Sequence, residues 1–171
     1  NKAGFIIHSA IHQARPKDLH CVMHSHEVNS QTLAASKSKL IPLTQEGCQL
    51  YERVGYHEFN GIVLNDEEKE KLINAIGNEK HTLLMRNHGL ITAGPTAAWA
   101  FIRHQHFIRN AEVQLKLMAS NAEMSIISDN VLKHTREQFE GGSAQAGAKV
   151  RHPEWPAFWR LLDTLDEKWK Y

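Results

Sequence analysis

Apolar residues recur at helical spacing in several stretches of the chain and at strand spacing in a few short ones. A repeat of three to four residues indicates an amphipathic helix, whereas short runs of apolar or β-branched residues indicate strands. Helices are predicted over residues 5–14, 28–36, 44–54, 65–77, 96–120, 129–140 and 153–165. Strands are predicted over residues 19–24, 81–85 and 90–92, and an extended segment over residues 40–43. This alternation indicates an α/β or α+β fold in which helices cover a sheet.

Residues with capping or breaking tendencies mark several of these boundaries. Asn65 can cap a helix whose first turn is acidic and which has Glu68 three residues later. Gly77 stands where a left-handed residue ends such a helix. Thr44 can cap the helix predicted to begin at it, over residues 44–54. The segment 141–147 is rich in small residues, which predicts a mobile loop.

The long helix predicted over residues 96–120 is expected to bury a single apolar stripe. Its members share helical spacing and are Ala97, Phe101, Ile108, Ala111, Leu115 and Met118. His104 falls within this stripe and is expected to be a hydrogen-bonded core residue. His106 points about 200° away from His104 and is expected to face solvent. In the last predicted helix, Trp155, Trp159 and Leu162 share one side.

Composition and charge are those of an ordinary globular protein. Hydrophobic residues make up 42% of the chain, charged residues 23%, and the net charge is +1. No large electrostatic field therefore favours nucleic acid or a membrane surface, and no apolar run approaches the length of a membrane span. Cys21 and Cys48 form neither a disulfide framework nor a metal-binding pair, which predicts two reduced thiols in a cytoplasmic protein. Because the chain begins with Asn1 and not Met, we expect it to be the interior of a longer protein or a trimmed product.

Histidine is frequent, at 12 of 171 residues, and two histidines have the spacing of metal ligands. His24 and His26 lie two apart at the end of a predicted strand, where residues i and i+2 face the same side. Two imidazoles placed in this way can reach one ion at about 2.0–2.1 Å. His88 is the best third candidate, because Gly89 after it allows the backbone to approach closely. The alternative is that the pair is structural and that His88 only forms a turn.

A set of three imidazoles would leave a fourth coordination position open, as catalytic zinc sites do. The same donors also bind cobalt, nickel, manganese or iron. His104 and His106 have the same spacing but lie on a predicted helix, where their side chains diverge and cannot bind one ion together.

Five segments together resemble the class II aldolase/adducin family: residues 3–16, 21–26, 40–45, 56–61 and 86–92. The similarity runs from residue 3 to residue 120, so we expect a family core over residues 1–120 and a C-terminal helical extension over residues 121–171. The resemblance implies a mostly antiparallel central sheet of nine strands flanked by helices, here lacking the usual N-terminal part. It also implies that His24, His26 and His88 hold zinc and that the protein forms a fourfold ring, a homotetramer with sites between subunits.

Enzymes of this family include sugar-phosphate aldolases, a pentose-phosphate epimerase and a dehydratase, in which zinc acts as a Lewis acid and stabilises an enediolate. The resemblance therefore implies a zinc-dependent lyase or isomerase for a small hydroxy-carbonyl or sugar-phosphate-like substrate. The sequence departs from the family pattern at two positions. Gly4 stands where family aldolases have a catalytic glutamate. The tyrosine that serves as proton donor in the fuculose-phosphate type aligns near Gln45 or Glu46, neither of which is a tyrosine. The family's phosphate-binding loops lie upstream of the first residue.

Segments 3–16 and 40–61 are nearer to adducin, which favours an alternative: a non-catalytic assembly or binding module with a relic metal site. A zinc hydrolase is a third reading, but the sequence places no general base for it. If the protein is an enzyme, the candidate catalytic groups are Glu27, Glu46 and His8. Each also has a structural interpretation. Glu27 can support a ligand or be a surface carboxylate, Glu46 can be a surface charge, and His8 can be a packed helix residue.

Overall fold

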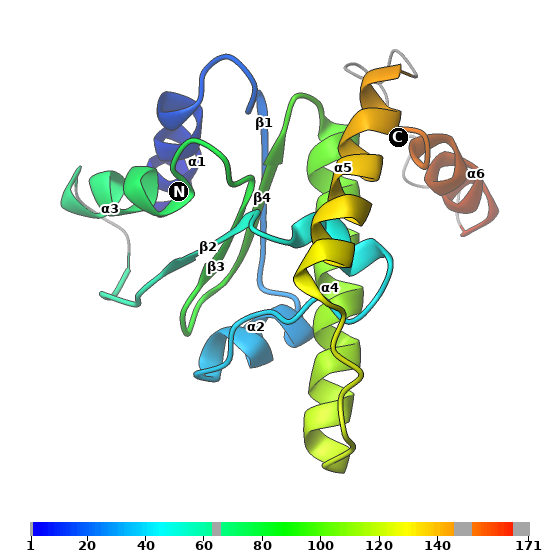
Figure 1. Cartoon of the computed structure of the whole chain (residues 1–171). Coiled ribbons are helices and arrows are strands. Elements are labelled where there is room, and N and C mark those ends of the chain that lie inside the picture. Colours follow the sequence, from blue (N-terminus) through cyan, green and yellow to red (C-terminus); the bar gives the residue numbers. More distant parts are fainter. Residues whose placement is uncertain (1, 63–65, 146–151, 166–171) are drawn as a thin grey trace.

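The computed structural model describes residues 2–62, 66–145 and 152–165, and its elements follow the predicted alternation (Figure 1). Six helices, a short 3-10 helix and four strands are described. In chain order they are α1 (Lys2–Ala14), β1 (Cys21–Ser25), α2 (Val28–Ala35), η1 (Glu46–Leu50), β2 (Val54–His57), α3 (Asp66–Ile76), β3 (Thr82–Met85), β4 (Gly89–Gly94), α4 (Ala97–Ser120), α5 (Asp129–Gln145) and α6 (Trp155–Leu165). The α/β expectation is confirmed.

The four strands form one mixed sheet in the order β1-β4-β3-β2. Strand β4 is antiparallel to both β1 and β3, whereas β2 and β3 are parallel. The sheet is therefore mostly antiparallel, as the family resemblance implies. Among the described residues it has four strands, fewer than the nine that the resemblance implies.

Side chains alternate between the two faces of the central strands, and each face has its own apolar core. Leu83, Met85, Ile91 and Ala93 pack against α1 and α3, with Ile7, Ile11, Leu72 and Ile76 from those helices. Leu84 and Leu90 point to the opposite face and pack with Leu33 of α2 and with Phe107 and Ala111 of α4. Figure 1 shows the resulting layers, with α1 and α3 on one side of the sheet and α4 and α5 on the other. Strands β3 and β4 are buried on both faces.

The predicted helix over residues 44–54 is wrong for most of its length. Only Glu46–Leu50 is helical, as a 3-10 turn to which Thr44 contributes by accepting a hydrogen bond from the Gly47 amide at 3.0 Å. Glu52 then adopts a positive φ of 60°, which ends any helical continuation. Val54 begins β2 because pairing with β3 outweighs the weak local preference for a helix.

Helix α4 buries only part of the stripe expected from its spacing: Ala111 is fully buried, and Phe101, Ile108 and Leu115 are partly buried. Ala97 and Met118 are exposed, while Ile102 and Phe107, outside the predicted stripe, are fully buried. The helix is covered along more than one side, because it contacts β1, β4 and α2 as well as η1. His104 is a buried, hydrogen-bonded residue as predicted.

His106 is only 3% exposed, so its predicted solvent position is wrong. It lies against Gln49 of η1 and, at 3.3 Å, the carboxylate of Glu154. The segments that cover it come from distant parts of the chain, so helical spacing alone gives no sign of them.

The C-terminal segments also correct one expectation. Helix α5 continues to Gln145, so residues 141–145 are helical and not a loop, while residues 146 and 147 lie outside the described residues. Gly77 has a φ of 55° and ends α3 as predicted, whereas the proposed cap Asn65 is not among the described residues. The division of the chain at residue 120 stays a prediction.

Two further points concern the surface and the thiols. Among the described helices, none combines the length and the hydropathy needed to cross a bilayer. Cys21 and Cys48 are both free thiols, in agreement with the sequence.

Candidate metal site

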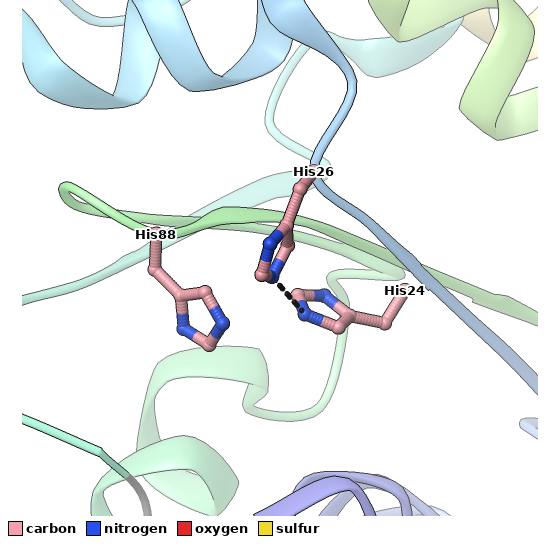
Figure 2. A group of neighbouring side chains, drawn as sticks. All are labelled: His24, His26 and His88. Atoms are coloured by element: carbon pink, nitrogen blue, oxygen red, sulfur yellow. Dashed lines mark hydrogen bonds between the residues drawn. The ribbon is translucent and has the colours of Figure 1, made fainter.

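The three histidines singled out by sequence come together at one end of the sheet (Figure 2). The ring centroids of His24, His26 and His88 are 4.8–4.9 Å apart in every pair. One nitrogen from each ring lies within 4.8 Å of the others. Among the described residues, no other group of three histidine, cysteine or acidic side chains meets this condition. The fold therefore brings His88 next to His26, although the two are 62 residues apart in sequence.

Strand β1 and its exit determine the positions of His24 and His26. Ser25 faces α4, where its hydroxyl lies 2.6 Å from His104 Nε2. Because side chains alternate along a strand, His24 faces the opposite side, toward α1. His26 follows directly after β1, and its imidazole returns to the same side (Figure 2). The i and i+2 spacing therefore brings both rings to one point, as the sequence predicts.

His88 occupies a tight three-residue turn between β3 and β4. The turn is closed by a hydrogen bond from the His88 amide to the Met85 carbonyl at 3.1 Å. Asn87 adopts a φ of 54°, a left-handed conformation that asparagine tolerates better than most residues. A Cβ atom at Gly89 would overlap the Ser25 carbonyl oxygen and lie 3.0 Å from His26 Cδ2. Glycine at this position is thus a condition for the close approach of His88 to the pair.

Hydrogen bonds to the backbone fix the orientation of the site. His24 Nδ1 lies 3.0 Å from the Leu90 carbonyl oxygen, so this nitrogen carries the proton and donates it. The Nε2 atom of His24 then presents its lone pair to the cluster, 3.0 Å from His26 Nε2. Gln31 of α2 donates to the His88 carbonyl at 3.1 Å and holds the turn from the other side. A carbonyl partner on the remote nitrogen is the usual support of a metal-bound imidazole.

Burial keeps two of the imidazoles neutral. Burial is the main cause that lowers the pKa of His24 to about 4; the neighbouring His88 and His26 act in the same direction and the bond to Leu90 in the opposite one. The pKa of His88 is also lowered, first by burial and then by His26 and His57. The neutral imidazole is the form that coordinates a metal ion.

A pocket of about 450 Å³ opens in front of the three rings. Gly4 and Ile7 of α1 line it, as do the exposed side chains of Phe59 and Ile62. The lining residues that the structure describes include no aspartate or glutamate. Gly4, the position that aligns with the family's catalytic glutamate, therefore does lie in the pocket, and an added Cβ would meet nothing within 4 Å.

The three candidate catalytic groups do not line this pocket. Glu27 caps α2, where its carboxylate accepts hydrogen bonds from the amides of Asn29 and Ser30. Glu46 begins η1, away from the histidines. His8 lies on α1, one turn after Gly4, and burial lowers its pKa. It is close enough to His24 to act on it electrostatically.

A buried pair beside the site was not anticipated from sequence. His57 Nε2 at the end of β2 lies 3.3 Å from Glu68 Oε2 of α3, and both side chains are buried. Lys71 also bonds to Glu68 at 2.6 Å. The spacing after Asn65 indicates a capping role for Glu68, and the sequence pattern does not predict β2, the strand that ends with His57.

A family model described as the class II aldolase and adducin N-terminal domain matches residues 1–115. A protein named putative aldolase class 2 protein from Caulobacter vibrioides is 38% identical over 170 residues, covering 95% of this chain and 62% of the relative. Alpha-adducin from Rattus norvegicus is 31% identical over 179 residues, covering all of this chain and 24% of the relative.

Among solved structures, an L-fuculose 1-phosphate aldolase from Glaciozyma antarctica is similar over 96% of this chain and 61% of its own. Its TM-score is 0.76 and the sequence identity is 27%. The present chain thus spans less than two thirds of the length of these relatives.

Proposed function

Because this chain belongs to the class II aldolase and adducin family, we propose that it is a metal-dependent lyase or isomerase for a small hydroxy-carbonyl compound. His24, His26 and His88 are the proposed ligands, and zinc is the proposed metal. The observation that carries the proposal is the convergence of three imidazole nitrogens within 4.8 Å of one another on the lining of a pocket. A location in the cytoplasm and a sugar-phosphate-like substrate are part of the same proposal.

The donor set fits a divalent transition metal ion. Three neutral imidazoles suit zinc, and equally cobalt, nickel or iron, whereas the absence of carboxylates among the described lining residues disfavours calcium and magnesium. The Leu90 carbonyl fixes the tautomer that directs His24 Nε2 to the cluster. A bound ion would supply Lewis-acid polarisation of a substrate carbonyl.

The remaining lining residues suit the binding of a polar compound with an apolar part. Gln31 and Asn87 bring amide groups to the pocket, which can bond to hydroxyl oxygens. Phe59 and Ile62 are 53% and 75% exposed, and a ligand that reached these side chains would cover them. These two side chains would hold the apolar part of a substrate and exclude water from the histidines.

A second candidate function is a non-catalytic binding or assembly module of the adducin type. Gly4 favours it, because the pocket position that aligns with the family's base carries no side chain. Removal of a proton next to a carbonyl by a positioned base contributes roughly 10²–10⁴ in rate. We therefore propose little or no fuculose-phosphate-type aldol cleavage by this chain itself, even with metal bound.

We further propose that the protein is a homo-oligomer, with a tetramer as the expected form. Helix α6 packs on Phe101 of α4 through Trp155 and Phe158, whose ring centroids lie 5.6 and 5.1 Å from that of Phe101. The outer side chains Leu161 and Leu165 are 53% and 70% exposed and extend the apolar surface. Light scattering at micromolar concentration tests this directly, and a monomeric mass would contradict it.

The test of the metal site combines affinity with stoichiometry. Metal-free protein is titrated with zinc against a chromophoric chelator, and bound zinc is measured by mass spectrometry. One equivalent is expected, with affinity lost in His24→Ala and His88→Ala. His134→Ala is the matched control, because His134 is an exposed histidine on α5, outside the pocket. Equal zinc binding by the parent protein and all three variants would contradict the proposal.

Activity is tested separately on zinc-loaded protein with a panel of sugar phosphates, unphosphorylated sugars and short hydroxy acids. Turnover that requires His24 supports the enzyme. Zinc binding without turnover on any compound supports the adducin-like alternative. Robust cleavage of a sugar phosphate would show that Gly4 does not limit catalysis.

A further inference from the structure

A second and larger pocket lies at the other end of the same strands. Its volume is about 840 Å³. It is lined by residues that come just before β1, β2 and β3 and just after β4, among them His20, Arg53, His81 and Thr96. The candidate metal site is built on the opposite strand ends, so the two pockets are separated by the length of the sheet. A role for this second pocket does not depend on the function proposed for the histidine site.

Arginine is the characteristic residue of this pocket, and two of its three arginines are already paired with carboxylates. Arg15 forms a paired interaction with the carboxylate of Asp18 and also donates to the Lys80 carbonyl at 2.9 Å. Arg53 donates to Glu140 Oε1 at 2.9 Å. Both guanidinium groups are thereby fixed along the pocket wall.

Arg103 of α4 is different. Its Nη1 atom donates to the Ala93 carbonyl at 2.6 Å, and its guanidinium lies 5.1 Å from the Trp99 ring centroid. No carboxylate lies within 4.0 Å of it among the residues that the structure describes, and its buried Nε has no hydrogen-bond partner there. Glu140 and Asp18 act on the Arg103 guanidinium only through space and are not in direct contact with it. A buried charge without a directly bonded carboxylate is costly, as is a buried donor left without a partner.

An anion in the pocket would remove both costs. The guanidinium fork matches the two oxygens of a carboxylate or phosphate, and a low local dielectric strengthens that interaction. His81 adds a buried imidazole to the same wall. Its own partner is the Thr82 hydroxyl, 2.9 Å from Nδ1. Burial, with Arg103, Arg53 and Arg15 nearby, holds the pKa of His81 well below its usual value, so it adds no charge of its own.

We propose that this arginine pocket is a second ligand site, which binds a small oxyanion, a carboxylate or a phosphate monoester, with Arg103 as its central contact. The planar pair of donors on Arg103 recognises the oxyanion. Arg15 and Arg53 add a positive field that their carboxylate partners only partly cancel. Glu140 limits the affinity, because it places a negative charge on the same pocket wall.

The other reading is that Arg103 only ties α4 to the end of β4. Gly94 supports a close fit here, since a Cβ at that position would lie 3.2 Å from Arg103 Nη1. A purely structural arginine would not respond to added anion, and this difference defines the experiment.

The full chain is titrated with inorganic phosphate and, in a parallel series, with malonate, at constant ionic strength set with chloride. Thermal unfolding and the Nε–Hε NMR signal of Arg103 are followed. We expect saturable stabilisation and a saturable shift of that signal. The series that saturates at lower concentration identifies the preferred oxyanion. The absence of saturation in both series, or a stationary Arg103 signal, would overturn the proposal, and this measurement needs no variant to fold.

Three substitutions sharpen the result. Arg103→Gln retains a donor for the Ala93 carbonyl but removes the charge, and it should weaken anion binding tenfold or more. Glu140→Gln should strengthen binding several-fold, because it removes the opposing charge. Arg109→Gln is the matched control, since Arg109 is an exposed arginine on the same helix outside the pocket. Binding that is unchanged in Arg103→Gln, or weakened equally in the control, would contradict the assignment.

Discussion

The substitution Gly89→Ala tests most directly how the fold builds the candidate metal site. Gly89 begins β4 beside the end of β1, where Ser25 pairs with Leu90. The added methyl would overlap the Ser25 carbonyl oxygen and lie 3.0 Å from His26 Cδ2 and 3.4 Å from His24 Cε1. A backbone oxygen in a paired strand cannot rotate away as a side chain can. The end of β1, which carries the two histidines, must therefore move.

The expected cost follows from this overlap. Insertion of one methyl group into a tightly packed position destabilises a protein by about 1–3 kcal/mol. The displaced strand end also moves His24 and His26 relative to His88, so zinc affinity should fall. Loss of a residue that supports metal ligands typically costs about 10–100-fold in affinity, and we expect a decrease in this range.

Urea unfolding of the metal-free protein gives the stability change, and zinc titration against a chelator gives the affinity change. Gly141→Ala is the control, because Gly141 lies in α5 with nothing within 4 Å of an added Cβ. It should raise the free energy of unfolding by about 0.5–1 kcal/mol, since alanine favours the helix. If Gly89→Ala had the same urea midpoint and the same zinc affinity as the parent protein, the conclusion that the site requires glycine at position 89 would be refuted.

Three other changes have defined outcomes. Burial lowers the pKa of His104 from 6.5 to about 4. The contribution of neutral His104 to the free energy of unfolding is therefore complete above pH 6.5 and is lost as the pH falls toward 4. The loss is about 3 kcal/mol by the linkage relation, and urea unfolding at pH 7 and 4.5 should show a smaller difference in His104→Gln. Glu27→Ala removes the cap of α2 and should lower the free energy of unfolding by about 1 kcal/mol, seen as a lower urea midpoint with an unchanged slope. Gly4→Glu should stabilise α1 and place a carboxylate in the histidine pocket. Turnover by zinc-loaded Gly4→Glu but not by Gly4→Gln would show that a base at position 4 is what the parent protein lacks. Inactivity of both variants would count against a catalytic role for position 4.

Local sequence signals were sufficient for most of the elements and for singling out the three histidines that cluster. Helical spacing located α1, α2, α4 and α6 to within a few residues, because the hydrogen bonds of a helix join residues close in sequence. Strand alternation correctly predicted that His24 and His26 share a direction. Gly89 and Gly77 were interpreted correctly, because the steric limits of glycine positions are local.

Other features were decided only by tertiary contacts. Val54 joins a strand because β3 is available to pair with it, and His106 is buried because η1 and Glu154 cover it. The arginine pocket has no local signature at all, since Arg15, Arg53 and Arg103 come from three distant segments. Pairing, burial and charge proximity all depend on residues remote in sequence. The sequence by itself therefore determined which side chains can serve as ligands, and the packed sheet decided which neighbours each of them meets.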